Sequence, residues 1–387
     1  MFAFPDMNKS YNMYTTLVEE FVANGHEVSV AAPGPITALQ SEAGIEILRV
    51  SSLPIKNVPN WIKGLSNLLL PWQFYRALQR YYPNKQYDLI ISATPPVTFS
   101  GLIKRIQKNS QAKFYLILRD IFPQNAVDLG FMRKGGVVWN YFRAKEKALY
   151  KQADFIGCMS PANKLYLERH EPELSANKIH LLPNYQKPFT LSSHTLPESL
   201  QSMIEGKFVV VFGGNMGKPQ QLENVLQLAK YASQYKDVLF LILGEGVQAT
   251  KVKGDAEQLG LTNVHIAGTM PKHIYQQLLQ KCHVGLISLN IRFTIPNIPS
   301  KALDYWNVGL PILASIDKAT DFGQILDETA TGLWAYADDA QSWQRQFDRL
   351  YQEANLRQMM AEAGRAYFKR ELLPGKAYST VMTHVEA

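Results

Sequence analysis

The sequence predicts an α/β protein made of two doubly wound domains, each a parallel sheet covered by helices on both faces. Short, continuous apolar runs alternate with amphipathic segments, which is typical of parallel strands buried on both faces. This pattern stops at a stretch without periodicity and then starts again. At 387 residues, the chain is also longer than one ordinary core accommodates, so two domains are expected.

The first domain is predicted over residues 1–187. A helix is expected over residues 14–23, and strands that end in polar or Pro-rich loops follow it: HEVSVAAP (26–33), YDLIISATPP (87–96), KFYLILRD (113–120), ADFIGCMSP (153–161) and IHLLPN (179–184). Before that helix, only MFAFP (1–5) is left for an opening strand. Pro5 suits a strand end because it cannot donate a ladder hydrogen bond. We therefore expect further apolar residues upstream of Met1 to complete this strand and to raise the melting temperature.

A linker is predicted over residues 188–206 and the second domain over residues 207–366. Its expected strands, two of which end in Gly-rich loops, are KFVVVFGGNMG (207–217), VLFLILGEG (238–246), VHIAGTM (264–270), VGLISL (284–289) and PILAS (311–315). Residues 367–387 are predicted to form a helix that packs back on the first domain. Doubly wound sheets bind ligands at the carboxyl ends of their strands, and two such domains facing each other would form a deep cleft.

The distribution of charge limits the classes of partner. The net charge is +7, but residues 49–151 alone contain 17 Lys and Arg against 4 Asp and Glu. A basic stretch of this kind favours nucleic acid, an anionic membrane or a phosphorylated ligand. No zinc-finger, helix-turn-helix or RNA-binding signature accompanies it, so no nucleic-acid partner is expected.

The expected compartment is the cytoplasm. No apolar run reaches the roughly 20 residues needed to cross a bilayer, and charged residues interrupt any N-terminal signal segment. Cys158 and Cys282 lie in different halves without CxxC spacing, so neither a disulfide nor a zinc site is expected.

A basic amphipathic segment over residues 58–82 is a candidate membrane contact. It combines Trp61, Leu68 to Leu70, Trp72, Phe74 and Tyr75 with Lys63, Arg76 and Arg80. Trp and Leu among cations favour the interface of an anionic bilayer. The alternative is a helix that packs on the sheet with its charges in solvent.

Two segments of the second domain are candidate phosphate sites. In FGGNMGKPQQLENV, Gly213, Gly214 and Gly217 would let backbone N–H groups approach a ligand, and Lys218 adds a full charge. The segment matches neither the P-loop nor the GxGxxG pattern, so a plain tight turn is the alternative.

The second segment is PSKALDYWNVGLPILAS, where a helix is expected to begin at Pro299-Ser300-Lys301. The helix dipole disfavours a lysine in the first turn, and a bound phosphate would offset that cost. Asp304 projects from a neighbouring helical position and could bind sugar hydroxyls. An ordinary ion pair between Lys301 and Asp304 is the alternative.

The order of GGNMGKPQQLE, LILGEG, IAGTMPKHIYQQLLQKCHVGLISL and PSKALDYWNVGLPILA resembles the C-terminal domain of GT-B retaining glycosyltransferases. RDIFPQNAVDLG, NGHEVSVAAP and LLPNYQ are similar to a branch in capsule, O-antigen and exopolysaccharide assembly that contains the L-fucosamine transferases. The resemblance implies two Rossmann-like domains facing across a cleft. It also implies transfer of a hexose or N-acetylaminosugar from a nucleotide-sugar, expected to be a UDP-sugar, to a lipid-linked or oligosaccharide acceptor in surface polysaccharide biosynthesis.

The resemblance also implies roles for particular residues. Those expected to bind the nucleotide-sugar are Gly214, Asn215, Lys218, Gly246, Met270, Ser300, Lys301 and Asp304. The expected catalytic residues are Arg119, Asp120, Lys218 and Lys301, and the expected acceptor loop is Asn8, Lys9 and Ser10. Neither a cofactor nor a metal is expected, and no DxD motif is present. A lipid-linked acceptor would place the protein on the inner face of the cell membrane.

Several positions depart from the family pattern. Pro296 stands where many members carry the first of two glutamates, Gln221 stands where glycine is usual, and Asn215 and Gln220 replace Arg and Lys. The loss of the first acid leaves a catalytically silent GT-B accessory subunit as one alternative. A GT-B-fold nucleotide-sugar epimerase is the other, although few carboxylates beyond Asp120 and Asp304 could serve it.

Overall fold

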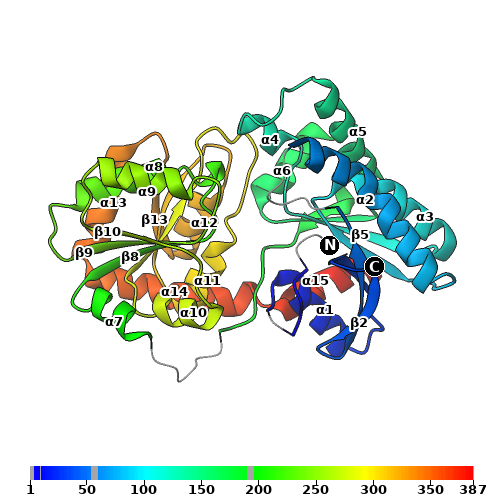
Figure 1. Cartoon of the computed structure of the whole chain (residues 1–387), viewed down its shortest axis with the longest axis horizontal. Coiled ribbons are helices and arrows are strands. Elements are labelled where there is room, and N and C mark those ends of the chain that lie inside the picture. The colour runs from blue at the N-terminus through cyan, green and yellow to red at the C-terminus, as the bar shows by residue number, and fades with distance from the viewer. Residues whose placement is uncertain (1–3, 9, 54–59, 190–195, 387) are drawn as a thin grey trace. The chain divides into compact units, whose positions relative to one another are not determined.

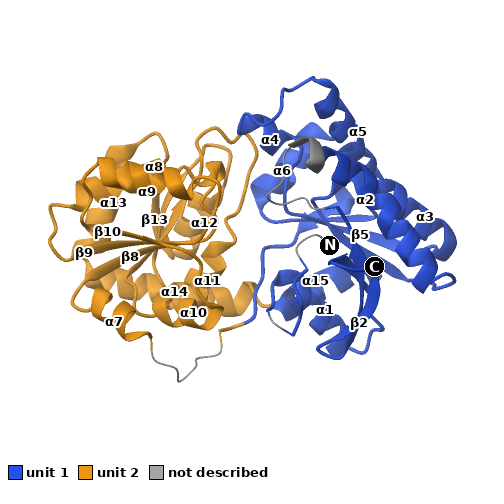
Figure 2. Cartoon of the chain, in the orientation of Figure 1, with its two compact units in different colours: residues 1–187, 374–387 blue, residues 188–373 orange. Residues whose placement is uncertain are grey.

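The computed structural model describes residues 4–8, 10–53, 60–189 and 196–386. They form two units, drawn in different colours in Figure 2: residues 1–187 with 374–387 make unit 1, and residues 188–373 make unit 2. Both units contain parallel sheets covered by helices (Figure 1), which confirms the predicted fold class.

Unit 2 is built on a six-stranded parallel sheet in the order β10–β9–β8–β11–β12–β13. This is the doubly wound order, and its direction of winding reverses between β8 and β11. The strands are β8 (Phe208–Gly213), β9 (Val238–Leu243), β10 (Val264–Ala267), β11 (Val284–Ser288), β12 (Ile312–Ile316) and β13 (Gly332–Tyr336). The sequence prediction lacks β13, an edge strand that is only partly buried.

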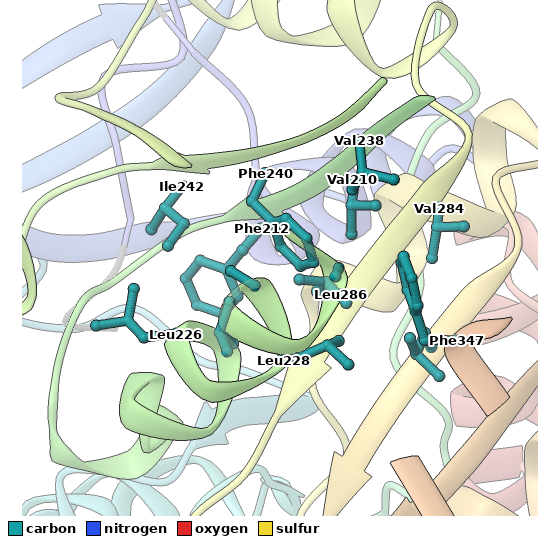
Figure 3. Packing of buried hydrophobic residues seen from close by; sticks show 14 of the residues in the cluster. Val210, Phe212, Leu226, Leu228, Val238, Phe240, Ile242, Val284, Leu286 and Phe347 are labelled. Carbon is teal, nitrogen blue, oxygen red and sulfur yellow. The ribbon is translucent and has the colours of Figure 1, made fainter. Parts of the chain in front are cut away.

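Helices cover both faces of this sheet. They are α7 (Glu198–Ile204), α8 (Leu222–Ala232), α9 (Ala249–Gln258), α10 (Lys272–Leu279), α11 (Lys301–Val308), α12 (Phe322–Thr329), α13 (Ala340–Gln352) and α14 (Ala354–Glu371), with a short 3-10 turn η3 (Lys218–Gln220). In Figure 3, Phe212 and Phe240 from the sheet pack with Leu226 of α8 and Phe347 of α13. The stretch predicted as linker contains α7, because a turn of helix forms after Pro197.

Unit 1 contains two sheets in its described residues. One has the order β1–β3–β2 and the other β4–β5–β6–β7. The strands are β1 (Val30–Gly34), β2 (Ala38–Glu42), β3 (Ile45–Ser51), β4 (Leu89–Ala93), β5 (Lys113–Leu118), β6 (Phe155–Cys158) and β7 (Ile179–Leu181). The prediction missed β2 and β3, which pair antiparallel through a turn in which Ala43 and Gly44 both have positive φ.

The predicted opening strand lies partly outside the described residues, because residues 1–3 are not described. Phe4 and Pro5 belong to no strand. Phe4 is buried against Val18, Val30 and Ile47. It also lines a cavity of about 610 Å³ bordered by residues of β1 and β4.

The helices of unit 1 are α1 (Met13–Ala23), α2 (Asn60–Tyr81), α3 (Ser100–Ser110), α4 (Gln124–Asp128), α5 (Val137–Gln152), α6 (Pro161–His170) and α15 (Pro374–Glu386), with 3-10 turns η1 (Val97–Phe99) and η2 (Ala176–Lys178). Asn12 caps α1 by accepting hydrogen bonds from the backbone N–H groups of Tyr14 and Thr15. The C-terminal helix α15 packs on α1, where Tyr378 Oη lies 2.8 Å from His26 Nε2.

Candidate functional site

Two glycine-containing loops meet at the carboxyl ends of β8 and β9. Gly214 N donates to Leu243 O at 2.9 Å, and Met216 N donates to Glu245 O at 2.7 Å. A Cβ atom on Gly244 would lie 1.9 Å from Gly214 O, so only glycine permits this approach. The contact holds the backbone of the β8 loop in place while Gly214 itself stays exposed.

Lys301, the first residue of α11, lies directly against this loop. A Cβ atom on Gly214 would be 3.4 Å from Lys301 Cε, and Lys301 Nζ lies 3.9 Å from the centroid of the Phe212 ring. Within the described part of the chain, no carboxylate comes within ion-pair distance of Nζ. Burial lowers the pKa of Lys301 to about 7. A bound anion would reverse this effect, because an opposite charge favours the ammonium form.

Tyr305 fixes the position of α11. Its hydroxyl lies 3.2 Å from both Val211 O and Leu286 O, and it accepts a hydrogen bond from Gly213 N at 3.4 Å. One buried hydroxyl thus joins α11 to β8 and β11, on either side of the point where the winding reverses. Sequence reasoning missed Tyr305, because an aromatic residue in an apolar helix reads as an ordinary core position.

Asp304 lies in the first turn of α11, opposite α10. Burial lowers the pKa of Lys272 on α10, and the negative charge of Asp304 partly opposes this. Tyr275, also on α10, packs so closely under the loop that a Cβ atom on Gly213 would lie 2.1 Å from its hydroxyl. Asp304 therefore interacts electrostatically with Lys272 of α10.

The remaining predicted nucleotide-sugar residues lie on loops at the same edge of the sheet. Lys218 is exposed in η3, and its carbonyl accepts a hydrogen bond of 2.9 Å from Asn290 Nδ2 beyond β11. Ser300 is exposed at the start of α11, and its side chain makes no cap hydrogen bond. Gly246 follows β9, and Met270 follows β10 and is partly buried. Asn215 is exposed in the β8 loop itself.

In unit 1, Arg119 and Asp120 follow β5. The guanidinium of Arg119 is buried and donates through Nη1 to Leu182 O at 3.0 Å, so it braces β5 against the chain beyond β7. The backbone N–H groups of Arg119 and Asp120 both donate to Thr94 Oγ1. Burial raises the pKa of Asp120 to about 6, and the charge of Arg119 opposes this rise.

The predicted acceptor loop is tied to the β2–β3 turn. Asn8 Oδ1 accepts a hydrogen bond of 3.0 Å from Ala43 N, and Ser10 N donates to Asp6 O at 3.0 Å. Ser10 is exposed, and Lys9 lies outside the described residues.

Two of the positions that depart from the family pattern lie in loops next to the site. Gln221 has a φ of +40°, in the left-handed region that favours glycine, and its Oε1 accepts a hydrogen bond from Ile291 N at 3.0 Å. Pro296 is buried between Ile295 and Asn297 in the loop that leads to α11.

The described residues contain no group of three or more His, Cys, Asp or Glu side chains that could hold a metal ion. Among the helices in the described ranges, none combines the length and apolar character needed to span a bilayer.

Comparisons with known proteins define the class and the family. Residues 200–367 match the family model "Glycosyl transferases group 1", and residues 12–185 match "Glycosyltransferase Family 4". The protein is a glycosyltransferase with the GT-B fold. The match to the group 1 glycosyl transferases lies in unit 2, and the match to family 4 lies in unit 1.

Two curated relatives are named as glycosyltransferases. The chain is 24% identical to the probable glycosyltransferase WbjE of Pseudomonas aeruginosa over 63% of this chain and 61% of that protein. It is 23% identical to the putative colanic acid biosynthesis glycosyl transferase WcaI of Escherichia coli K12 over 82% of both chains. The alignment thus spans less than two thirds of WbjE.

Solved structures share the fold at low sequence identity. Anabaena HepE in complex with UDP-glucose superposes with a TM-score of 0.69 and 13% identity, covering 99% of this chain and 98% of that one. This similarity shows that the two proteins share a fold.

Proposed function

We propose that this glycosyltransferase transfers a sugar from a UDP-sugar to a lipid-linked acceptor, with retention at the anomeric carbon, in bacterial surface polysaccharide biosynthesis. The observation that carries the donor assignment is the contact between Lys301 and the Gly214 loop. In this contact, Lys301, which has no ion-pair partner in the described part of the chain, lies beside the exposed backbone of Gly214. Both lie near the point between β8 and β11 where the winding of the sheet reverses, and doubly wound folds bind nucleotides at such points.

The chemical task is to stabilise negative charge that accumulates on the leaving diphosphate. The backbone N–H groups of Gly214 and Asn215, with the ammonium groups of Lys218 and Lys301, would provide donors for it. Losing one preorganised donor of this kind typically costs about 3 to 4 kcal/mol in the barrier. Gly246, Met270 and Ser300 complete the proposed donor site; Met270 would lie near the base.

The proposed catalytic residue on the acceptor side is Asp120. Its pKa of about 6 suits proton exchange near neutral pH. Arg119 would act through Asp120, because its charge holds that pKa down while its own guanidinium is engaged in the interior. Asn8 and Ser10 are proposed to contact the acceptor.

The proposal places the enzyme at the inner face of the cell membrane, and α2 supplies the surface. Leu65, Leu68, Leu69 and Trp72 are exposed and recur at helical spacing; we call them the α2 stripe. The structure corrects the predicted segment, because Leu70 and Phe74 are buried and hold α2 on the unit. The side chain of Trp61 lies outside the described residues. Each of the two interpretations of this segment therefore has support: one face of α2 packs on the unit, and another is exposed and available to a membrane.

Calorimetry with UDP and a panel of UDP-sugars, followed by a product assay, tests the function. The transferase should bind the donor and release UDP faster when an acceptor is present. A silent accessory subunit would bind without turnover, and an epimerase would convert the donor without an acceptor. Failure to bind any UDP-sugar would refute the donor assignment.

Asp304→Asn should weaken binding of both free UDP and UDP-sugars by about tenfold or more. A hydrogen bond to a charged group is worth roughly 1.5 to 3 kcal/mol, and both ligands contain the ribose that Asp304 is proposed to bind. Calorimetry measures the change, with Asp338→Asn, an exposed acid of the same unit, as the matched control. Unchanged UDP affinity in Asp304→Asn would exclude the ribose role.

Leu68→Ser combined with Trp72→Ser should reduce co-sedimentation with anionic vesicles without lowering the melting temperature, because both side chains are exposed. Binding should also fade as salt rises, since the Debye length falls from about 10 Å at 0.1 M to about 3 Å at 1 M. Leu165→Ser, exposed on α6, is the control. Equal binding to neutral and anionic vesicles would contradict the electrostatic part.

A further inference from the structure

The segment between α4 and α5 exposes large apolar side chains. Phe131 is 56% exposed, and Val137 and Val138, in the first turn of α5, are 87% and 57% exposed. The packing of α5 on the unit uses Phe142 and Leu149. Val138 lies one turn before Phe142 on the same side of the helix, but it is exposed there and is not among the buried residues of α5. Neither valine therefore contributes to the core of the unit.

The same segment is strongly basic. Arg133 and Lys134 lie between the exposed apolar residues and are themselves exposed. Residues 129–145 contain 4 Lys and Arg and no Asp or Glu. Of these cations, Arg143 is engaged with Glu146 and Glu171. The segment therefore combines exposed apolar side chains with exposed cations, and this combination complements a surface that is both apolar and anionic.

The segment belongs to the same layer of helices as the α2 stripe. Both α2 and α5 pack against η1 and against α3. Two apolar surfaces flanked by cations thus occur on neighbouring parts of one layer.

We propose that residues 131–138 form a second membrane anchor, in which Phe131, Val137 and Val138 enter an anionic bilayer while Arg133 and Lys134 bind its headgroups. This inference rests on the proposed membrane association of α2. An apolar side chain gains free energy by leaving water for the acyl boundary, and Lys and Arg near the surface add attraction to anionic lipid. Two separate points of attachment would also restrict rotation of unit 1 on the membrane.

The test uses vesicles of phosphatidylcholine with or without an equimolar amount of phosphatidylglycerol. The triple variant Phe131→Ser, Val137→Ser, Val138→Ser and the double variant Arg133→Glu, Lys134→Glu should each lower partitioning into the anionic vesicles by at least about tenfold. Ile36→Ser, exposed at 60% elsewhere in unit 1, should leave it unchanged. Melting temperatures confirm that each variant is folded.

A labelled variant reads insertion directly. Val137→Cys carrying an environment-sensitive fluorophore should shift to shorter wavelength with anionic vesicles, and the two native cysteines should react slowly because burial raises the pKa of both thiols. An unshifted label, or wild-type partitioning of both variants, would overturn the inference. A dimer in light scattering that the triple variant abolishes would also overturn it, in favour of a second copy of the chain.

These outcomes separate this inference from the proposed function. If only the α2 variant loses vesicle binding, the second anchor fails and the proposed function stands. If UDP-sugars do not bind while the labelled segment inserts, the donor assignment fails and the anchor stands.

Discussion

Lys301→Met should raise the free energy of unfolding of the protein without bound donor. The same substitution should lower kcat/KM for the donor by at least about tenfold. Burial lowers the pKa of Lys301 from 10.5 to about 7. At about 1.4 kcal/mol for each pKa unit, this shift sets an upper limit of about 5 kcal/mol on the cost of the partly buried ammonium. Methionine keeps the length of the side chain and removes this cost. The loss of activity follows because a charge-assisted bond to phosphate is worth roughly 1.5 to 3 kcal/mol.

The pH dependence has a definite sign. Between pH 7 and 10.5, the unfolded chain binds the Lys301 proton and the native state does not, so wild-type stability rises with pH across that window. The stabilisation by Lys301→Met should therefore be largest below pH 7 and should shrink towards pH 10. Thermal unfolding at several pH values measures it.

Lys218→Met is the matched control, because Lys218 is exposed. It should weaken donor binding without changing the melting temperature. A lower melting temperature for Lys301→Met, with normal kinetics, would show that Lys301 is a structural residue. Binding of UDP at pH 8 should also take up a proton on Lys301, which calorimetry in two buffers of different ionisation enthalpy detects.

The proximity of the two segments proposed to bind the donor was predictable from the sequence. Lys301 and the Gly214 loop are distant in the chain, but each follows a strand of one parallel sheet, and the carboxyl ends of neighbouring strands meet at one edge. Their contact follows from that rule once β8 and β11 are recognised. Tyr305 was not predictable, because its hydroxyl bonds to backbone groups of β8 and β11 that only the fold brings near it. Tyr275 was not predictable either, because its packing under Gly213 also depends on the fold.

Unit 1 was harder to predict because its strands carry buried charges. Glu42 and Arg49 are both buried, and they form an ion pair at 2.5 Å across the β2–β3 hairpin. Each charge interrupts the apolar pattern that identifies a strand. Burial of either charge alone would be strongly destabilising, so the two can be buried only as a pair. Because the partners are seven residues apart, no local sequence pattern indicates that they will pair.

Residues 58–82 show the limit of periodicity in a helix. The pattern identified α2 correctly, yet the apolar residues on its two faces differ in burial. Leu70 and Phe74 are buried, whereas Leu68 and Trp72 are exposed. Which face meets the sheet depends on the neighbouring turn η1, so the exposed stripe becomes visible only in the structure.

Asp120→Asn should raise the melting temperature and lower turnover by about a hundredfold or more. Burial raises the pKa of Asp120 from 3.8 to about 6. Above pH 6 the carboxylate is ionised in both native and unfolded states, and the native state then bears a cost of about 3 kcal/mol. Asparagine removes that cost and cannot exchange a proton, for which positioned acids and bases typically contribute 10² to 10⁴ in rate.

The pH dependence of stability also has a definite sign for Asp120, and it distinguishes a catalytic carboxylate from one that stabilises the fold. Wild-type stability should fall as pH rises from 3.8 to 6, because the native state binds more protons there, and the advantage of Asp120→Asn should appear over the same interval. Arg119→Met removes the charge that holds this pKa down, so it should move the acidic limb of the pH–rate profile to higher pH. Asn125→Ala, an exchange of a polar side chain on nearby α4, should leave that limb in place. A destabilised Asp120→Asn with normal turnover would mean that the carboxylate serves the fold, since only a residue retained for chemistry would be kept at a cost to stability.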